Sequence, residues 1–564
     1  LKGEKTIEDG KEISNNFNYF FIHIGPTLAN KIPPSKRNPT DYIKNNVLES
    51  FFVQATCEAE IEKILGNLKN SSAGWDDFLP QHIKLVKQHI KEPLSHICNR
   101  SFLTGIFPRE LKLANVIPIY KNGVDNLFTN YRPVSILPVF SKVLETLMYR
   151  RLLDFINKKK MLYELQFGFR EKYSTYMALI TMVDNITEAL NKGESAIGIF
   201  LDFSKAFDTV DHNILLQKLQ KYGIRGVSHD WFTSYLSNRE QYVTYNSVKS
   251  SKLKILCGVP QGSILGPLLF LLYINDLSTV SSAALLFMFA DDSSLLYMGK
   301  NLNALVDIVN DELDKINEWL KCNKLSINVK KTNYTIFCTP KKMLEDLPIK
   351  LNNEAITRIY FTKFLGVFLD AGLTWKYHIE HISKKISKSI GILCKARKLL
   401  HKKTLINLYY TFVYPYFTYG IHVWGGIYPT NLQKLVLLQK KIIRIITCSK
   451  YLASTENLFK SYNILKFHDI YKYTVGNFVY QFDNKLLPVV FDNFYITNRL
   501  IHAHNTRTCG DLCLINTKLN TRQFSIRYAG AKLWNSIPLH IRQSKSLEIF
   551  KRSYKTHLMK SLTY

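Results

Sequence analysis

The chain has 564 residues, more than a single hydrophobic core usually organises, so we expect about two to four subdomains. Lysine and arginine outnumber aspartate and glutamate by 75 to 45, and the resulting formal charge of +30 implies a polyanionic partner. Nucleic acid is the first candidate, and a membrane surface is the weaker one because no apolar run reaches about 18 residues.

Residues 1–110 are predicted to form a helical N-terminal extension without a catalytic role, since apolar residues recur there at helical spacing. A strand is predicted at residues 113–120. Lys121 follows it, and Arg132 lies beyond a polar loop, where the two cations could meet an incoming triphosphate. Arginine offers a planar fork to phosphate and lysine a point charge. A solvated surface charge is the alternative for each residue.

Two helices are predicted at residues 139–160 and 174–192, separated by the sequence QFGFR at 166–170. Gly168 lies between two aromatic residues of this sequence. A glycine in such a position indicates a close approach of the backbone. The approach can be to a ligand or to a neighbouring element, and the pattern leaves both open.

Three acids follow apolar segments that are typical of buried strands. Asp202 ends the run at 196–203, and Asp291 and Asp292 lie at the tip of a predicted hairpin at 284–298. Two neighbouring carboxylates at the edge of a core repel each other and lose solvation unless a cation joins them. We expect the three acids to converge. For any one of them alone, an ordinary polar turn is the alternative.

An oxygen-rich site of this kind suits Mg²⁺, which binds carboxylates together with water and substrate phosphates. A pair of such ions can stabilise the attacking and the leaving oxygen of a phosphoryl displacement. The acids therefore favour nucleotidyl transfer.

Two further segments carry candidate ligand contacts. Phe207 follows Asp202 closely enough for its ring to flank a sugar, with a core aromatic as the alternative. In the loop at 258–263, Gln261 has an amide suited to a base or sugar edge, and Gly262 allows the backbone to approach a ligand. The loop leads into an apolar helix.

The second half of the chain is mostly helical by its pattern. After a helix at 303–321, one of two adjacent lysines, Lys330 or Lys331, could donate a proton to departing pyrophosphate. A tight pair of strands is predicted around residues 364–367. The helix that follows has a basic side, including Lys384 and Lys388, that suits a duplex backbone.

The nine cysteines form no evident disulfide framework, which is typical of a reducing compartment. Cys509 and Cys513, near His502 and His504, are the one cluster to weigh as a zinc site. No second close pair of ligands follows at a suitable spacing, so we do not expect zinc there.

Four stretches resemble, in order and spacing, the palm motifs of reverse transcriptases: LDFSKAFD at 201–208, PQGS at 260–263, FADD at 289–292 and FLG at 364–366. The resemblance is to the polymerase region of non-LTR (LINE-type) retrotransposons, in particular jockey-like elements. The segments at 130–133, 166–170 and 419–425 support this choice.

This resemblance implies an α+β protein with a right-hand polymerase fold, in which fingers, a palm with an antiparallel sheet and a helical thumb lie between helical N-terminal and C-terminal extensions. The expected division is a helical extension at 1–110, fingers and palm at 111–366, a helical thumb at 367–450 and a basic C-terminal region of unknown role at 451–564.

The resemblance also implies residue roles. The acids Asp202, Asp291 and Asp292 would bind two Mg²⁺ ions, with Mn²⁺ as a substitute, and Lys331 would be the proton donor. The expected nucleotide contacts are Lys121, Arg132, Phe207 as a gate against the ribose 2′-OH, Gln261 and Gly262. The expected nucleic-acid contacts are Arg170, Phe364, Leu365, Gly366, Lys384 and Lys388.

We therefore expect an RNA-directed DNA polymerase that copies an RNA template into DNA from a primer 3′-OH, with template RNA, primer DNA and dNTPs as partners and no membrane. A catalytically silent nucleic-acid-binding relic of such an element is the alternative, and Phe207 disfavours RNA synthesis. Such elements usually carry an endonuclease domain upstream. It is absent from this chain, which opens on Leu1, so we expect a longer reading frame. Priming on chromosomal DNA would require the nucleus, and assembly with RNA as a ribonucleoprotein would begin in the cytoplasm.

Overall fold

The computed structural model describes residues 7–44, 47–339, 347–501 and 509–560, and its helices and strands form an α+β protein. Within these ranges no helix is both long and apolar enough to cross a bilayer. All nine cysteines are free thiols. His502 and His504, which were weighed with Cys509 and Cys513, lie outside the described residues.

A five-stranded central sheet has the strand order β12-β9-β3-β8-β7. Every neighbouring pair is antiparallel except β12 and β9, which are parallel. The strands are β3 (Ser195–Asp202), β7 (Leu285–Phe289), β8 (Asp292–Gly299), β9 (Asn333–Phe337) and β12 (Thr357–Arg358). The predicted strand that ends at Asp202 and the predicted acidic hairpin are confirmed, and the sheet makes them neighbours.

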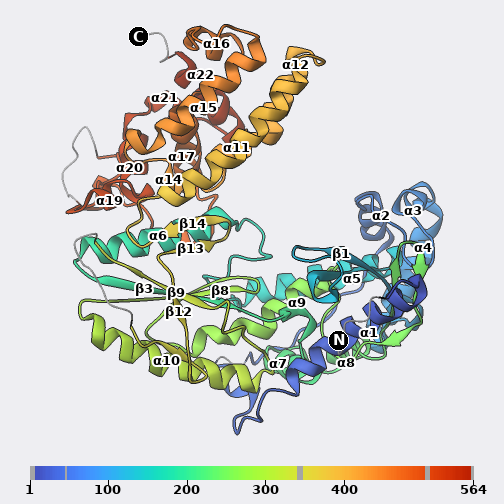
Figure 1. Cartoon of the computed structure of the whole chain (residues 1–564). Coiled ribbons are helices and arrows are strands. Elements are labelled where there is room, and N and C mark those ends of the chain that lie inside the picture. The colour runs from blue at the N-terminus through green and yellow to red at the C-terminus, as the bar shows by residue number, and fades with distance from the viewer. Residues whose placement is uncertain (1–6, 45–46, 340–346, 502–508, 561–564) are drawn as a thin grey trace.

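Strand β3 lies between two helical layers. The first seven of its eight residues are buried. Ala196 and Phe200 pack into a core with α6 (Thr175–Asn191). The alternate residues Ile197 and Ile199 pack into a second core with α10 (Leu302–Cys322). Figure 1 shows α6 above the sheet and α10 below it. Because both faces of β3 are covered, its sequence is a continuous apolar run rather than an alternation of apolar and polar residues.

A second sheet has the order β2-β1-β4-β5, with β6 paired to β4. Its strands are β1 (Leu113–Tyr120), β2 (Tyr131–Ile136), β4 (Glu240–Tyr245), β5 (Val248–Lys249) and β6 (Leu253–Lys254). Helix α1 (Gly10–Ala29) covers one face, where the ring of Phe17 lies 4.9 Å from that of Tyr131. The strand predicted at 113–120 is β1.

Helices around these sheets fill one large core. They are α2 (Glu58–Gly66), α3 (Pro80–Leu85), α4 (Lys87–Thr104), α5 (Val139–Lys158), α7 (His212–Lys221), α8 (Val227–Leu236) and α9 (Leu265–Ile274). Helix α9 is apolar on all sides and nine of its ten residues are buried. A helix with this pattern belongs inside the protein. The helices predicted at 139–160, 174–192 and 303–321 are present with nearly the predicted ends.

Two short hairpins connect the central sheet to the C-terminal helices: β10 (Lys350–Leu351) with β11 (Glu354–Ala355), and β13 (Phe361–Phe364) with β14 (Val367–Asp370). The C-terminal helices are α11 (Lys376–Ala396), α12 (Lys402–Phe412), α13 (Tyr414–Thr418), α14 (Ile421–Trp424), α15 (Pro429–Thr447), α16 (Glu456–Ser461), α17 (Phe467–Asp483), α18 (Asn498–Ile501), α19 (Asn520–Gln523), α20 (Ile526–Ser536), α21 (Leu539–Arg542) and α22 (Leu547–Lys560). They lie above the central sheet in Figure 1.

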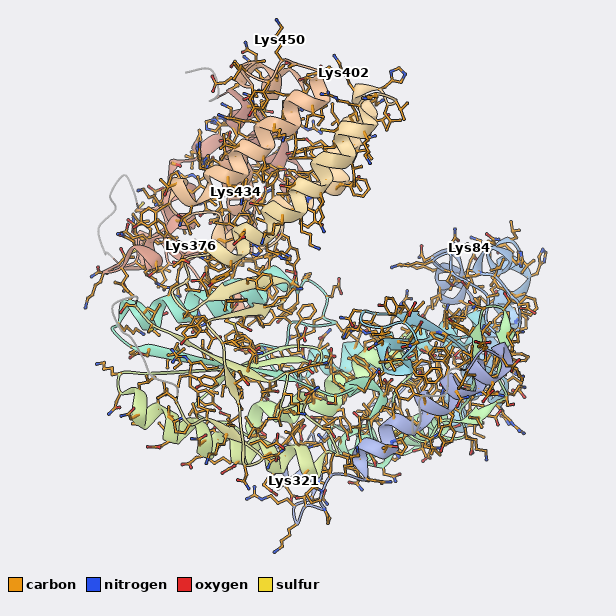
Figure 2. All side chains as sticks on the ribbon, in the orientation of Figure 1. Lys84, Lys321, Lys376, Lys402, Lys434 and Lys450 are labelled. Atoms are coloured by element: carbon orange, nitrogen blue, oxygen red, sulfur yellow. The ribbon has the colours of Figure 1, made fainter. Side chains whose placement is uncertain are left out.

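The C-terminal helices share a core with one face of the central sheet. Ile386 of α11, Ile470 of α17 and Trp534 of α20 belong to the same buried cluster as Phe200 of β3. The residues after 450 therefore pack with those before 450 and with α6. Positive charge is spread over the whole molecule, as the labelled lysines from Lys84 to Lys450 in Figure 2 illustrate.

A buried ion-pair network fastens the C-terminal helices to α6. The Arg522 guanidinium donates hydrogen bonds to a carboxylate oxygen of Asp184 at 2.6 Å and to its carbonyl at 2.8 Å. Both residues are at most 5% exposed. Arg527 donates to the other carboxylate oxygen at 3.3 Å. A buried carboxylate needs such partners because it has lost its water.

Arg522→Met should destabilise the protein strongly, because it leaves Asp184 buried with only the weaker Arg527 contact. Loss of one partner from a buried pair costs about 3–5 kcal/mol. Urea denaturation of the full chain measures the effect as a shift of the unfolding midpoint. The matched control is Arg552→Met at an exposed position of α22. Equal midpoints for the two variants would contradict an anchoring role for the network.

Candidate active site at the turn between β7 and β8

Three acidic residues lie at one end of the central sheet. Asp202, the last residue of β3, lies opposite Asp292, the first residue of β8. Asp292 also pairs with Phe289 of β7, so Ala290 and Asp291 form a two-residue turn. Ala290 has a φ of 55°, a left-handed conformation that side chains other than glycine adopt at a cost. The two sequence regions that carry the acids are thus neighbours at this end of the sheet.

The environment of this turn disfavours negative charge. Burial raises the pKa of the partly buried Asp291, and Asp202 raises it further. Loss of solvation, followed by Asp291 and Asp202, raises the pKa of Asp292, although the residue stays exposed at the tip. Lys121 and Arg132 act in the opposite direction on both acids. A bound cation would relieve the repulsion that remains.

The donors suit a hard divalent cation, since they are carboxylate oxygens on two adjacent strands. In the described part of the chain, however, no three Asp, Glu, His or Cys side chains are gathered into a ready-made metal site. Mg²⁺ commonly takes part of its coordination from water and substrate phosphates.

Cationic side chains surround the acids. Lys121 follows β1, and its backbone N–H donates a hydrogen bond to the Asn130 carbonyl. Arg132 of β2 pairs with Ile119 of β1. Both cations therefore lie at the same end of the β1–β2 hairpin. The Lys331 ammonium lies 3.9 Å from the Asp202 carboxylate. Sequence analysis identified these three residues.

Lys205 is a fourth cation, which sequence analysis missed. It has a left-handed φ of 52°, and its ammonium lies 3.3 Å from the Tyr131 carbonyl. Burial lowers its pKa, and the neighbouring Lys121 and Arg132 lower it further, against the effect of Asp208. In the sequence, only its position three residues after Asp202 indicated that Lys205 lies near the acids.

Phe207 and the loop at 258–263 lie side by side, since the Val259 N–H donates a hydrogen bond to the Phe207 carbonyl. The Phe207 ring stacks on Phe270 of α9, with centroids 4.3 Å apart. The Gln261 amide donates to the Asp208 carboxylate at 2.7 Å, and the Gln261 carbonyl accepts from the Ser135 N–H at 2.8 Å. A Cβ on Gly262 would lie 2.3 Å from the Ser135 carbonyl. The close approach of strand β2 therefore leaves no room for a side chain at position 262.

Glu145 of α5 supports the same loop from inside the protein. This fully buried carboxylate accepts the backbone N–H of Ile264 at 2.7 Å and that of Leu265 at 3.3 Å, at the start of α9. Burial raises its pKa, and the two N–H groups lower it. A negative group at a helix N-terminus is favourable, so Glu145 fixes where the loop ends.

The turn at Phe364, Leu365 and Gly366 joins β13 to β14. Leu365 and Gly366 have positive φ values of 44° and 85°. The Tyr419 hydroxyl donates a hydrogen bond to the Leu365 carbonyl at 2.6 Å. The motif at 419–425 therefore stabilises this turn.

Arg170 makes its contacts inside the protein. Its guanidinium donates to the carbonyls of Tyr163 at 2.9 Å and Gln166 at 3.1 Å. It also lies 4.0 Å from the centre of the Tyr173 ring. The expected contact of Arg170 with nucleic acid stays a prediction.

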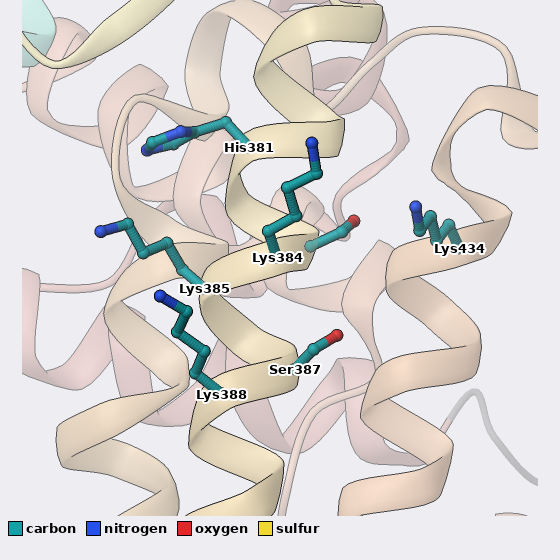
Figure 3. Close-up of a pocket in the computed structure, with 7 residues that line it drawn as sticks. His381, Lys384, Lys385, Ser387, Lys388 and Lys434 are labelled. Carbon is teal, nitrogen blue, oxygen red and sulfur yellow. The ribbon is translucent and has the colours of Figure 1, made fainter.

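A basic groove of about 470 Å³ lies between α11 and α15 rather than at the acids. The groove is lined by Lys384, Lys385 and Lys388 of α11 and by Lys434 of α15. In Figure 3, Lys384 extends on the side of α11 that faces Lys434, whereas Lys385 and Lys388 extend from the other side. Lys384 also forms an ion pair with Glu380 at 2.8 Å. The predicted basic side of this helix is present.

Residues 119–369 match the family described as reverse transcriptase (RNA-dependent DNA polymerase). This segment contains the three acids, the four cations, Phe207, Gln261 and the turn at 364–366. This part of the chain is therefore similar to reverse transcriptase domains.

The similarity extends to particular mobile elements. The chain is 28% identical over 477 residues to the RNA-directed DNA polymerase from mobile element jockey of Drosophila melanogaster, covering 82% of the chain and 51% of that protein. It is 30% identical over 412 residues to the protein of the same name from Drosophila funebris, covering 71% of the chain and 44% of that protein. The probable RNA-directed DNA polymerase from transposon X-element of Drosophila melanogaster is 29% identical over 413 residues, again 71% and 44%. The chain thus spans about half the length of these relatives, and the predicted resemblance to non-LTR retrotransposon reverse transcriptases is confirmed.

Asp208 should make stability depend on pH. Burial raises its pKa from 3.8 to about 6, so the folded protein holds this proton more tightly than the unfolded chain. The stability that the proton contributes is complete below the unfolded pKa and is lost as the pH rises through about 6. Asp208→Asn avoids this loss and should gain about 1 kcal/mol over wild type between about pH 5 and pH 8.

Urea denaturation at a series of pH values measures this gain. Asp307→Asn, on the exposed face of α10, is the matched control and should show no such trend. A difference between Asp208→Asn and wild type that stays constant with pH would show that Asp208 does not carry a raised pKa.

Proposed function

We propose that the chain is an active RNA-directed DNA polymerase that copies an RNA template into DNA from a primer 3′-OH. The observation that carries this proposal is the meeting of Asp202, Asp291 and Asp292 at one end of the central sheet, inside the reverse transcriptase domain. In the right-hand description, the central sheet is the palm, the second sheet belongs to the fingers, and the helices from α11 to α15 form the thumb.

The three acids would hold two Mg²⁺ ions, for which Mn²⁺ can substitute. When bound, these ions would polarise the primer hydroxyl and stabilise the charge on pyrophosphate. The protein's own contribution is placement and electrostatics. Lys121, Arg132 and Lys205 offer positive charge to the triphosphate, and Lys331 lies close enough to Asp202 to donate a proton to the leaving group.

The nucleotide would be selected by Phe207 and by the loop at 258–263. Phe207 is held by its stack on Phe270, so its ring can act as a fixed wall against a ribose 2′-OH. Gln261 and Gly262 belong to a loop that Glu145 and Ser135 hold in place, and this loop would contact the nucleotide or its template base. Such rigid support favours discrimination between deoxyribose and ribose, because the Phe207 ring can exclude a 2′-OH only if it is held in place.

Template RNA and primer DNA would be held by surfaces on either side of the acids. The turn at 364–366 would contact the primer strand, and Lys384 and Lys388 would contact the phosphates of the duplex. Arg170 would act near the template. An upstream endonuclease, and a ribonucleoprotein that passes from the cytoplasm to the nucleus, complete the proposal for the whole element.

The alternative is a silent relic that binds nucleic acid through its basic surface. No described feature favours it, since all three acids and the residues that support them are intact. Extension of a primer on a poly(rA) template, with Mg²⁺ and with EDTA, separates the two functions.

Asp202→Asn or Asp291→Asn should lower nucleotide incorporation by about a thousandfold or more, because each removes a negative oxygen from the site while keeping its shape. The affinity for a template–primer duplex, measured by fluorescence anisotropy without Mg²⁺, should stay within about twofold of wild type, because contacts to the duplex phosphates elsewhere on the protein dominate this affinity. Asp307→Asn is again the matched control. Wild-type extension by either active-site variant would refute the site assignment.

Lys384→Ala with Lys388→Ala should weaken duplex binding and make it less sensitive to salt. Each lost phosphate contact lowers the slope of log affinity against log salt by about one. Anisotropy titrations over a salt series measure the slope. The control pair is Lys532→Ala with Lys545→Ala, two exposed lysines elsewhere in the C-terminal region. An unchanged slope in the first pair would remove α11 from the duplex-binding surface.

A further inference from the structure

The segment 165–168 runs along the edge of the acidic hairpin. Strand β7 is the last strand in the order of the central sheet. The Phe167 N–H donates to the Met288 carbonyl at 2.7 Å, and the Met288 N–H donates to the Leu165 carbonyl at 3.0 Å. Gln166 forms a parallel β-bridge with Met288. This short segment thus pairs with β7 immediately before the turn that carries Asp291.

The side chain of Gln166 reaches from this segment to the turn itself. It is 1% exposed. Its amide oxygen accepts the Gly168 N–H at 2.9 Å and the Ala290 N–H at 3.2 Å. One buried acceptor therefore joins the two backbones, and the Ala290 N–H that it binds belongs to the left-handed residue beside Asp291. Its amide nitrogen has no hydrogen-bond partner among the described residues.

Gly168 and Arg170 keep this contact tight. A Cβ on Gly168 would lie 2.3 Å from the Ala290 nitrogen, so only glycine allows the two backbones to approach this closely. The close approach indicated by the sequence is therefore to a neighbouring element. On the other side, the Arg170 guanidinium binds the carbonyl of Gln166 and stacks on Tyr173.

The turn needs such support for two reasons. A left-handed alanine costs roughly 1–2 kcal/mol, so an unsupported turn relaxes to other conformations. The adjacent carboxylates of Asp291, Asp292 and Asp202 also repel one another, which favours any movement that separates them. A buried, shared acceptor opposes both effects, because leaving the Ala290 N–H unpaired would cost about 1–3 kcal/mol.

We propose that Gln166 is a positioning residue, which holds the backbone of Ala290 so that Asp291 and Asp292 stay in register with Asp202 for metal binding. The catalytic part of this inference rests on the proposed polymerase function. The structural part, that Gln166 fixes the turn, stands without it.

The test compares two buried glutamines. Gln166→Met keeps the length of the side chain and removes the acceptor. Gln439→Met does the same in α15, where the Gln439 amide donates to the Tyr409 hydroxyl at 3.0 Å and the Leu465 carbonyl at 2.9 Å, in an element that does not carry the acids. Both variants lose buried hydrogen bonds, so a general loss of stability affects both.

Hydrogen exchange of the peptide that contains Ala290 is the first measurement, and it needs neither metal nor substrate. Gln166→Met should raise its exchange rate by about tenfold or more, and Gln439→Met should leave it unchanged. Unchanged exchange in Gln166→Met, or an equal increase in both variants, would overturn the inference. Should Gln166→Met fail to fold, Gln166→Asn withdraws the acceptor by one methylene and should give the same result.

Primer extension over a range of Mg²⁺ concentrations is the second measurement. Gln166→Met should lower kcat by about tenfold to a hundredfold and raise the Mg²⁺ concentration for half-maximal rate, with duplex affinity unchanged. If wild type does not extend a primer, the proposed function fails while exchange still decides the role of Gln166. If wild type extends and Gln166→Met matches it in rate and Mg²⁺ requirement, the positioning role alone fails.

Discussion

The repulsion among three carboxylates that share one end of a buried sheet is the constraint on which the site depends. Asp202 and Asp292 face each other across adjacent strands, and Asp291 adds a third charge from the turn. Lys121 and Arg132 offset part of this charge. The excess of negative charge makes the site unfavourable without a cation and also gives it affinity for divalent cations. The electrostatic repulsion at this end of the sheet and the capacity to bind a metal therefore have the same cause.

Support for the functional turns comes from elements that are distant in the sequence. Gln166 holds the acidic turn, Glu145 holds the start of α9, and Tyr419 holds the turn at Leu365. In each case a side chain binds backbone groups rather than the side chains that would meet a ligand. Such contacts fix a turn while leaving its functional groups free, which is how a site becomes preorganised.

Much of this arrangement could be predicted from the sequence. Apolar runs predicted the strand that ends at Asp202 and the hairpin whose turn carries Asp291, and helical periodicity predicted α5, α6 and α10 nearly to their ends. The same apolar runs predicted that the acids converge, because Asp202 ends one buried strand and Asp291 and Asp292 lie at the tip of a buried hairpin. These predictions rest on patterns that are local in the chain or shared with a family.

The remaining features depend on long-range packing, which has no local pattern. Arg522 looks like any other basic residue of the C-terminal region, and only the fold shows that it binds Asp184 on α6. Gln166 and Glu145 were likewise indistinguishable from surface polar residues until their partners were known. Gly262 was predicted to approach a ligand, and the structure shows that the carbonyl of Ser135 requires the glycine.

The joint core of the C-terminal helices and the central sheet has a consequence for how the protein is made. One face of β3 is covered through α6, and α6 receives Arg522 and Arg527 only after more than three hundred further residues have been synthesised. The contacts that fasten the C-terminal helices to α6 therefore form only after most of the chain has been synthesised, and a product that terminates before Arg522 lacks them.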